Sequence, residues 1–250
     1  MVQLRKSRKN SAIFLVPSMI TVVSMCSGFY AMVQAIYGNL SVACVAVFIS
    51  MVLDGLDGRI ARITKTSSSF GAELDSLADM VAFGVAPAVI SFLWYANQYN
   101  RSIGLVASFI YCACVALRLA RFNSNNSDVD KLFFCGLPSP AAAGLVIGYI
   151  YLVNEYKNDY SWLLSSEVML GGVIILLVTA LSMVSNVKFY SFKEIHGSPK
   201  IIALVLSIIL VLLVMLTYKY KGLIVFGLLA GYIGINLLLQ PFYKTKLVVN

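Results

Sequence analysis

The stretch of sequence that decides the fold and points to a function runs from residue 54 to residue 79 and reads DGLDGRIARITKTSSSFGAELDSLAD. It carries four aspartates: Asp54, Asp57, Asp75 and Asp79. Because the whole chain is 60% hydrophobic and only 12% charged, we expect these carboxylates in surroundings of low dielectric constant. Like charges packed together there are costly unless cations lie between them. The stretch therefore predicts a site for one or two divalent metal ions that prefer oxygen ligands, Mg²⁺ or Mn²⁺, and two ions are our expectation.

The spacing of the aspartates predicts two acidic helix faces that meet. At ~100° per residue, four residues fall within an arc of about 100° on the first helix: Asp54, Asp57, Gly58 and Ala61. Three residues spaced by four stack along one side of the second helix: Gly71, Asp75 and Asp79. An alternative is that Arg59, Arg62 and Lys65 neutralise three of the acids as structural ion pairs. Ion pairing does not explain the small residues on both faces, which leave room for a bulky group near the backbone.

The composition of the chain is typical of a helical membrane protein. Its 250 residues have a mean hydropathy of +0.85, and long apolar runs alternate with short polar loops. We expect an all-α, polytopic bundle that forms a single membrane domain over residues 1–250, with about eight transmembrane helices. The expected spans are residues 13–36, 40–63, 71–95, 103–121, 141–153, 168–187, 201–218 and 222–239. Pro87 is expected to kink or loosen the third span.

The distribution of positive charge predicts the orientation of the bundle. With the N-terminus inside, 15 of the 19 lysine and arginine residues fall in inner segments, and the outer ones are Arg101, Lys157, Lys219 and Lys221. Because cytoplasmic loops carry the excess of positive charge, we expect both termini in the cytoplasm. The aspartates then lie at the cytoplasmic edge of the inner membrane. This arrangement accounts for the net charge of +8 without a nucleic-acid partner.

Metal held by carboxylates, with an arginine nearby, suits a pyrophosphate or phosphate ester. A divalent ion neutralises the charge that develops during phosphoryl-type transfer, and Arg62 can assist. One of the crowded carboxylates can take the proton of the attacking hydroxyl. Because the site lies at a membrane edge, one substrate is expected to be a lipid. The residues alone therefore predict a metal-dependent transferase that acts on a phosphorylated lipid.

The same stretch matches the pattern D-x₂-D-G-x₂-A-R-x₈-G-x₃-D-x₃-D at every fixed position. This pattern is the signature of the CDP-alcohol phosphatidyltransferases, which the chain resembles. Three segments resemble the phosphatidylserine synthase branch of that family: FGAELDSLADMVAFGVAPA, ALRLARFN and GLPSPAAAG. We expect residues 13–153 to form the catalytic portion and residues 168–239 to add further transmembrane helices. Relatives commonly carry asparagine near the first span, where this chain has Ser18 and Ser24, so no role is carried over for those asparagines.

The resemblance implies a reaction and a set of roles. The protein would displace CMP from CDP-diacylglycerol with the hydroxyl of L-serine, giving phosphatidylserine, and would work in the lipid bilayer as a homodimer. The four aspartates would ligate the metal ions, and Asp79 would also be the catalytic base. Gly58 and Ala61 would leave room for the cytidine nucleotide, Arg62 would contact phosphate, and Gly71 would allow close helix approach.

Three basic residues further along the chain, Arg118, Arg121 and Lys131, are candidates for binding the substrate's phosphate or the serine carboxylate. The alternative is positive-inside anchoring for the arginines and a solvated loop charge for the lysine. The same three residues could form the anion pocket that a phosphorylated acceptor needs, so glycerol 3-phosphate or an inositol phosphate is an alternative acceptor. A remote alternative is an ion-coupled transporter that uses the aspartates, which predicts acids near the bilayer midplane and paired broken helices.

Overall fold

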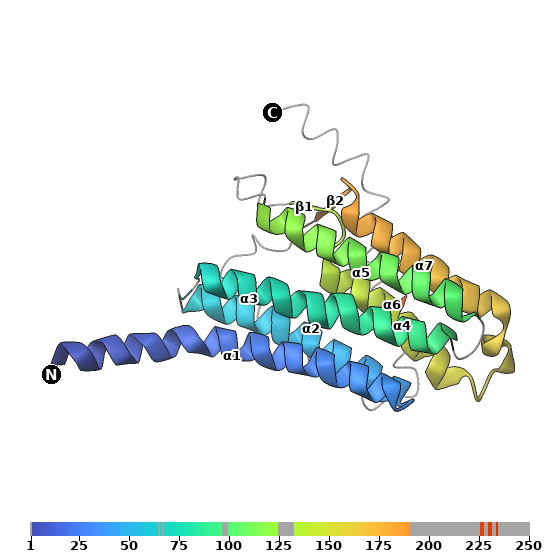
Figure 1. Cartoon of the computed structure of the whole chain (residues 1–250), viewed down its shortest axis with the longest axis horizontal. Helices are drawn as coiled ribbons and strands as arrows, with labels where there is room; N and C mark the ends of the chain where they lie inside the picture. Colours follow the sequence, from blue (N-terminus) through green and yellow to red (C-terminus); the bar gives the residue numbers. More distant parts are fainter. Residues whose placement is uncertain are drawn as a thin grey trace.

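The computed structural model describes residues 2–64, 66, 68–96, 100–124 and 133–190, together with residues 226, 227, 230, 231 and 234. Its framework is a bundle of helices (Figure 1): α1 (Val2–Ile36), α2 (Leu40–Ile63), α3 (Ser69–Asp79), α4 (Ala86–Ala96), α5 (Arg101–Ser124), α6 (Ser139–Tyr156) and α7 (Ser166–Val184). The π-helical turn η1 (Met80–Val85) joins α3 to α4, and the short 3-10 turn η2 (Ser161–Leu164) precedes α7. Strands β1 (Phe133–Cys135) and β2 (Lys188–Tyr190) form one antiparallel pair. Apart from that pair, the described residues confirm the all-α prediction.

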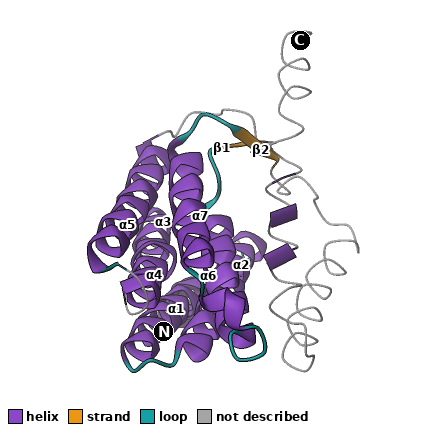
Figure 2. Ribbon diagram, turned by 90° about the vertical axis from the view of Figure 1, so that its right-hand side faces the viewer, coloured by secondary structure: helices purple, strands orange, loops and turns teal. Residues whose placement is uncertain are grey.

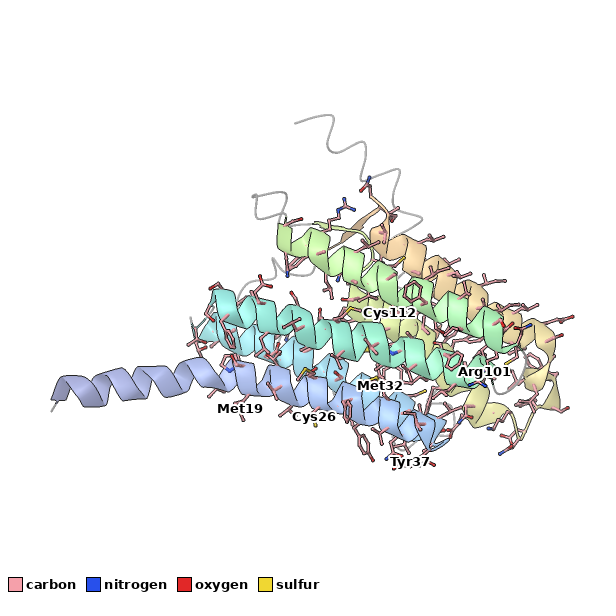
Figure 3. All side chains as sticks on the ribbon, viewed as in Figure 1. Met19, Cys26, Met32, Tyr37, Arg101 and Cys112 are labelled. Carbon is pink, nitrogen blue, oxygen red and sulfur yellow. The ribbon has the colours of Figure 1, made fainter. Side chains whose placement is uncertain are left out.

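Five described helical segments are long and apolar enough to cross a membrane: Val16–Ile36, Leu40–Ile63, Ser69–Tyr95, Arg101–Ser124 and Ser166–Val184. Their outer faces carry exposed apolar side chains such as Met19 on α1 (Figure 3), which is 61% exposed. A surface of this kind is stable against lipid rather than water, so the protein is an integral membrane protein. The residues of the expected fifth span form α6, which is not one of these five segments and packs between α2 and α7. The spans expected at 201–218 and 222–239 lie almost wholly outside the described residues, so the total of eight stays a prediction.

Helices α1 and α2 lie side by side (Figure 1) and are joined by serine hydroxyls. Ser24 on α1 donates to the carbonyl oxygen of Ser50 at 2.9 Å, and Ser50 donates back to the carbonyl of Ser24 at 2.8 Å. Ser27 donates to the Ala46 carbonyl at 2.8 Å. Small residues let two helix backbones approach closely, and their hydroxyl groups form hydrogen bonds between the helices where water is scarce. Ser24 therefore has a packing role between α1 and α2.

Just before Pro87 the helix loosens into the π-helical turn η1. Proline has no N–H, and its ring clashes with the carbonyl four residues earlier, which here is that of Phe83. In this wider turn, the Ala86 N–H donates a hydrogen bond to the carbonyl oxygen of Val81, five residues earlier. The Phe83 carbonyl accepts instead from the buried hydroxyl of Tyr111 on α5, at 3.0 Å. A side chain of another helix thus supplies a donor for a carbonyl that proline cannot serve.

The start of α6 is held at one end of the bundle by the strand pair (Figure 2), which the sequence did not predict. Gly136 follows β1 with a φ of 82°, a left-handed conformation that glycine adopts without strain. Its N–H donates to the Val187 carbonyl at 2.8 Å, and a side chain there would run into the Met183 carbonyl. This junction with the end of α7 fixes where Ser139, the first residue of α6, can lie.

Replacing Tyr111 by phenylalanine would keep the ring and remove the donor to the Phe83 carbonyl. Because a buried polar group left without its partner costs about 1–3 kcal/mol, we expect Tyr111→Phe to lower the thermal unfolding midpoint of the detergent-solubilised protein. Tyr37→Phe is the matched control, since Tyr37 is 74% exposed, and it should leave the midpoint unchanged. An unchanged midpoint for Tyr111→Phe would show that the π-helical turn does not depend on this hydrogen bond.

Candidate active site

Asp54 and Asp57 lie in the second half of α2, and Asp75 and Asp79 lie on α3. One carboxylate oxygen each from Asp54, Asp57 and Asp75 lies within 4.8 Å of the other two. The carboxyl group of Asp79, at the end of α3, interacts with that of Asp54. The first two acids are three residues apart on α2 and the other two are four apart on α3. Each helix therefore presents its pair on one face, and the two faces meet.

The burial of Asp57 makes this cluster fit a metal ion. Its side chain is only 3% exposed, and its Oδ2 atom has no hydrogen-bond partner among the described residues. A buried carboxylate oxygen without a donor is costly. A divalent cation with a preference for several oxygen ligands would relieve both that deficit and the repulsion between neighbouring carboxylates. The residues present therefore fit Mg²⁺ or Mn²⁺ by their chemistry and their spacing.

The small residues of the signature border this cluster. Among the described residues, a Cβ atom added at Gly58 would meet only Arg62 Nη1, at 3.7 Å, so in this part of the chain the space over the turn of α2 is bordered by one exposed guanidinium. Ala61, one turn further along α2, is half-buried. At Gly71 the N–H donates to Ser68 Oγ at 3.0 Å, and an added Cβ would come within 3.2 Å of that same oxygen. The surroundings of Gly71 thus belong to the start of its own helix.

Arg118 lies beside the cluster and reaches it through a serine. Its Nη1 atom donates to Ser139 Oγ at 2.8 Å, and Ser139 Oγ donates to Asp79 Oδ2 at 3.5 Å. Its Nε atom is buried without a partner among the described residues. The end of α5 therefore presents a guanidinium next to Asp79 with hydrogen-bonding capacity to spare.

Arg121, one turn beyond Arg118, points to a different part of the molecule. Its Nη2 atom donates to Asn186 Oδ1 at 2.6 Å and its Nη1 atom to the Val184 carbonyl at 3.3 Å. Both partners lie at the end of α7, so these contacts tie α5 to α7. Lys131, the third basic candidate, lies outside the described residues.

Two residues at the site were not predicted from the sequence. Ser139 lies in the GLPSPAAAG segment, so its position was noted but no role was inferred. Thr21 on α1 places its hydroxyl beside the Asp57 carboxylate and also bonds to the Pro17 carbonyl at 3.0 Å. No pattern in the sequence of α1 marks Thr21, because the contact is made with another helix.

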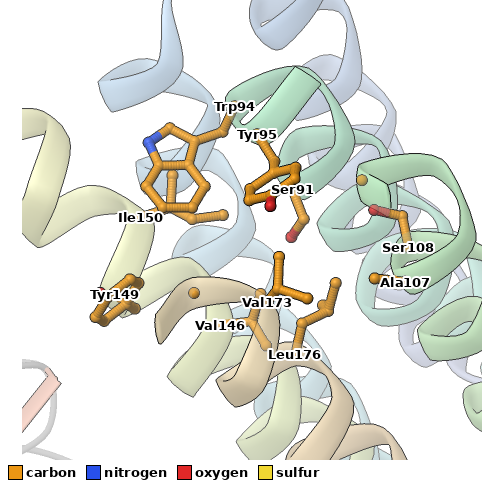
Figure 4. Close-up of a pocket in the computed structure, with 12 residues that line it drawn as sticks. Ser91, Trp94, Tyr95, Ala107, Ser108, Val146, Tyr149, Ile150, Val173 and Leu176 are labelled. Atoms are coloured by element: carbon orange, nitrogen blue, oxygen red, sulfur yellow. The ribbon is translucent and has the colours of Figure 1, made fainter. Parts of the chain in front are cut away.

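A small pocket lies between α4, α5, α6 and α7 (Figure 4). Ser91, on its wall, is twelve residues beyond Asp79 along the same continuous helix, which corresponds to about 18 Å. None of the residues that line the cavity is charged. Groups suited to acid–base or phosphate chemistry are therefore found at the aspartate cluster and not in this cavity.

Comparison with known proteins extends these observations. The sequence profile of the CDP-alcohol phosphatidyltransferase family matches residues 14–184. A CDP-diacylglycerol–serine O-phosphatidyltransferase of Helicobacter pylori J99 is 40% identical over 194 residues, covering 78% of this chain and 79% of the relative. A protein of the same name from Methanocaldococcus jannaschii is 35% identical over 171 residues, covering 67% of this chain and 75% of the relative.

Solved structures share the fold. The phosphatidylinositol phosphate synthase of Mycobacterium tuberculosis with CDP-DAG bound superposes with a TM-score of 0.52 at 19% identity, covering 72% of this chain and 86% of that one. The same enzyme in complex with manganese and citrate gives a TM-score of 0.52 at 20% identity, covering 72% of this chain and 84% of that one.

The profile match takes in the acidic cluster and every described helix from the membrane-spanning part of α1 to the end of α7. It is joined by relatives that are 35–40% identical over two thirds or more of this chain. The chain belongs to the CDP-alcohol phosphatidyltransferase family.

Proposed function

We propose that this protein transfers the phosphatidyl group of CDP-diacylglycerol to the hydroxyl of L-serine, forming phosphatidylserine and releasing CMP. The observation that carries the proposal is the meeting of carboxylates from α2 and α3 with the Arg118 guanidinium at one end of the bundle. The choice of serine is supported by the relatives named CDP-diacylglycerol–serine O-phosphatidyltransferase at 35–40% identity.

The carboxylates would hold the divalent metal that this chemistry needs. Asp54, Asp57 and Asp75 offer oxygens within 4.8 Å of one another, and Asp79 adds a fourth group beside Asp54. When bound, Mg²⁺ or Mn²⁺ supplies positive charge that neutralises the phosphate oxygens during transfer. The manganese complex of a structural neighbour supports the choice of ion, and two ions stay our expectation.

The open turn of α2 would receive the nucleotide half of CDP-diacylglycerol. Gly58 has no neighbour closer than Arg62 Nη1, so the cytidine can approach the backbone there and at Ala61. The exposed Arg62 guanidinium can swing onto a phosphate oxygen, for which its planar fork is suited. Gly71 would complete this subsite from the start of α3.

Asp79 would be the base. As the oxygen of the serine hydroxyl bonds to the phosphorus that carries diacylglycerol, the bond from that phosphorus to the CMP oxygen breaks. The hydroxyl proton passes to the Asp79 carboxylate, and CMP leaves with the bonding electrons. Asp79 suits this role because it lies between the acidic cluster and Arg118, where an acceptor must bind.

Arg118 would bind the carboxylate of serine. Its buried Nε has no partner among the described residues, and a carboxylate can accept two parallel hydrogen bonds from one guanidinium. Arg121 is occupied by Asn186 and Val184, which favours the anchoring alternative for that residue. Roles for Lys131 and for a phosphorylated acceptor such as glycerol 3-phosphate or an inositol phosphate stay open to the assay below.

The active site would lie on the cytoplasmic side of the inner membrane. Arg59, Arg62, Arg118 and Arg121 all lie at the helix ends that carry the acidic cluster, and cytoplasmic ends of membrane helices carry the excess of positive charge. The family match gives no support to the transporter alternative. The expected homodimer stays a prediction.

The first experiment is CMP release by the purified protein from CDP-diacylglycerol with Mg²⁺ or Mn²⁺. Serine, glycerol 3-phosphate and inositol phosphate are offered one at a time. We expect CMP release that depends on serine, together with phosphatidylserine as the lipid product. Release with another acceptor only would overturn the serine assignment and keep the metal site. No release with any acceptor, from folded protein that binds metal, would overturn the transferase assignment.

Asp79→Asn keeps the shape of the side chain and removes the base. We expect kcat to fall roughly 10²–10⁴-fold, while most CDP-diacylglycerol binding is retained. Glu73→Gln on the same helix is the control, because Glu73 contacts Asn123 at 3.5 Å rather than the cluster, and it should keep wild-type turnover. Wild-type activity in Asp79→Asn would rule out its role as the base.

Asp57→Ala removes a buried ligand. We expect the metal-dependent part of CDP-diacylglycerol binding to disappear, a larger effect than the ~10–100-fold that supporting residues contribute. Without metal, the variant should unfold at the same temperature as the metal-free wild type or at a higher one, because the substitution removes a buried carboxylate that lacks a partner. Asp159→Ala, in the loop between α6 and α7, is the control. Unaltered metal-dependent binding in Asp57→Ala would contradict the metal assignment.

A further inference from the structure

We infer that Ser139 is a positioning residue that holds Asp79 and Arg118 in their working orientations. The inference rests on the roles proposed above for those two residues. Ser139 is the first residue of α6 and is fully buried. Its hydroxyl lies where the ends of α3 and α5 meet the start of α6, so one oxygen atom connects three helices.

The direction of the hydrogen bonds at this hydroxyl follows from chemistry. A guanidinium can only donate, whereas a serine hydroxyl has one hydrogen to donate and two lone pairs to accept with. Because Ser139 Oγ accepts from Arg118 Nη1 at 2.8 Å, its own hydrogen is free to point to Asp79 Oδ2, 3.5 Å away. Donation from a cation makes the hydroxyl a better donor in turn. The long second contact can shorten when substrates bind, as catalytic hydrogen bonds commonly do.

The backbone around Ser139 is built to keep this hydroxyl in place. Pro138 precedes it with a φ of −58° and Pro140 follows it in the first turn of α6, and proline restricts the backbone on both sides. Three residues upstream, Gly136 is tied to Val187 by a 2.8 Å hydrogen bond. The hydroxyl therefore has a fixed position, and the longer side chains of Arg118 and Asp79 are held against it.

A serine at a helix start is commonly a cap for its own helix, and the structure does not support that role here. The N-cap of α6 is Pro138, and no side chain caps the helix. The hydroxyl of Ser139 instead bonds to side chains that are 21 and 60 residues away in the sequence. Holding one Asp79 oxygen leaves the other to face the cluster, and holding one edge of Arg118 leaves Nε to face the acceptor.

The test compares variants of the full-length protein in the CMP-release assay, with rate, KM for serine, KM for CDP-diacylglycerol and thermal midpoint measured for each. Loss of a group that orients a reacting residue typically costs 10–100-fold. We expect Ser139→Ala to lower kcat by roughly that factor and to raise KM for serine. KM for CDP-diacylglycerol should be nearly unchanged, because that substrate would bind over α2.

Two further variants separate the hydroxyl from its bulk. Ser139→Thr and Ser139→Val add nearly the same volume and differ in the hydroxyl alone, so Thr should recover much more kcat than Val. Ser108→Ala is the control for removing a buried serine: it lines the cavity of Figure 4, and its Oγ has no partner among the described residues. We expect wild-type kinetics from Ser108→Ala.

Equal activity of the Thr and Val variants, or wild-type kinetics in Ser139→Ala, would overturn the positioning role. A uniform loss that follows the thermal midpoint, with both KM values unchanged, would also overturn it, since that pattern reports folding alone. The wild-type reaction in the same assay keeps the two proposals distinct. If the wild type transfers to serine and Ser139→Ala does so equally well, the positioning role fails while the proposed function stands. If the wild type uses another acceptor, the serine assignment fails and the variants still test Asp79 with that acceptor.

Discussion

Carboxylates held within a few ångströms of one another repel, and a helix bundle with little internal water screens that repulsion poorly. Asp57 is the extreme case, 3% exposed and with one oxygen lacking a partner in the described structure. Such a cluster persists only where positive charge is supplied close by. Divalent ions would supply most of it, and Arg118 reaches the cluster from α5. The need for cations links the stability of this end of the bundle to its chemistry.

The helices can bring these acids together because their backbones are satisfied without water. Tyr111 serves the Phe83 carbonyl that Pro87 cannot reach, and the paired serines of α1 and α2 serve each other. The helices also pack closely: a Cβ atom added at Gly28 on α1 would lie 2.7 Å from the Cα atom of Ala82 in η1. Packing of this kind leaves few alternative arrangements. It therefore holds the two acidic faces in a fixed relation.

The site lies where substrates of different polarity can meet. CDP-diacylglycerol would arrive from the bilayer with its nucleotide over α2, and a water-soluble acceptor would reach Arg118 at the helix ends. Ser139 stands between the residue proposed to bind the acceptor and the residue proposed to accept its proton. A fixed hydroxyl at this point couples binding of the acceptor to the orientation of the base. Catalysis by positioning of this kind needs little movement of the protein.

The sequence by itself determined the helices and the acidic signature, because both are local. Apolar runs set the five described spans to within a few residues, and spacings of three and four residues place each pair of aspartates on one face. Only the tertiary structure decided which residues of other elements these side chains contact. Ser139 and Asp79 are 60 residues apart, and β1 pairs with β2 across a similar interval. Arg118 and Arg121 share one helix end, yet one turns to the cluster and the other to α7, because the neighbouring helices, not their own, provide the partners.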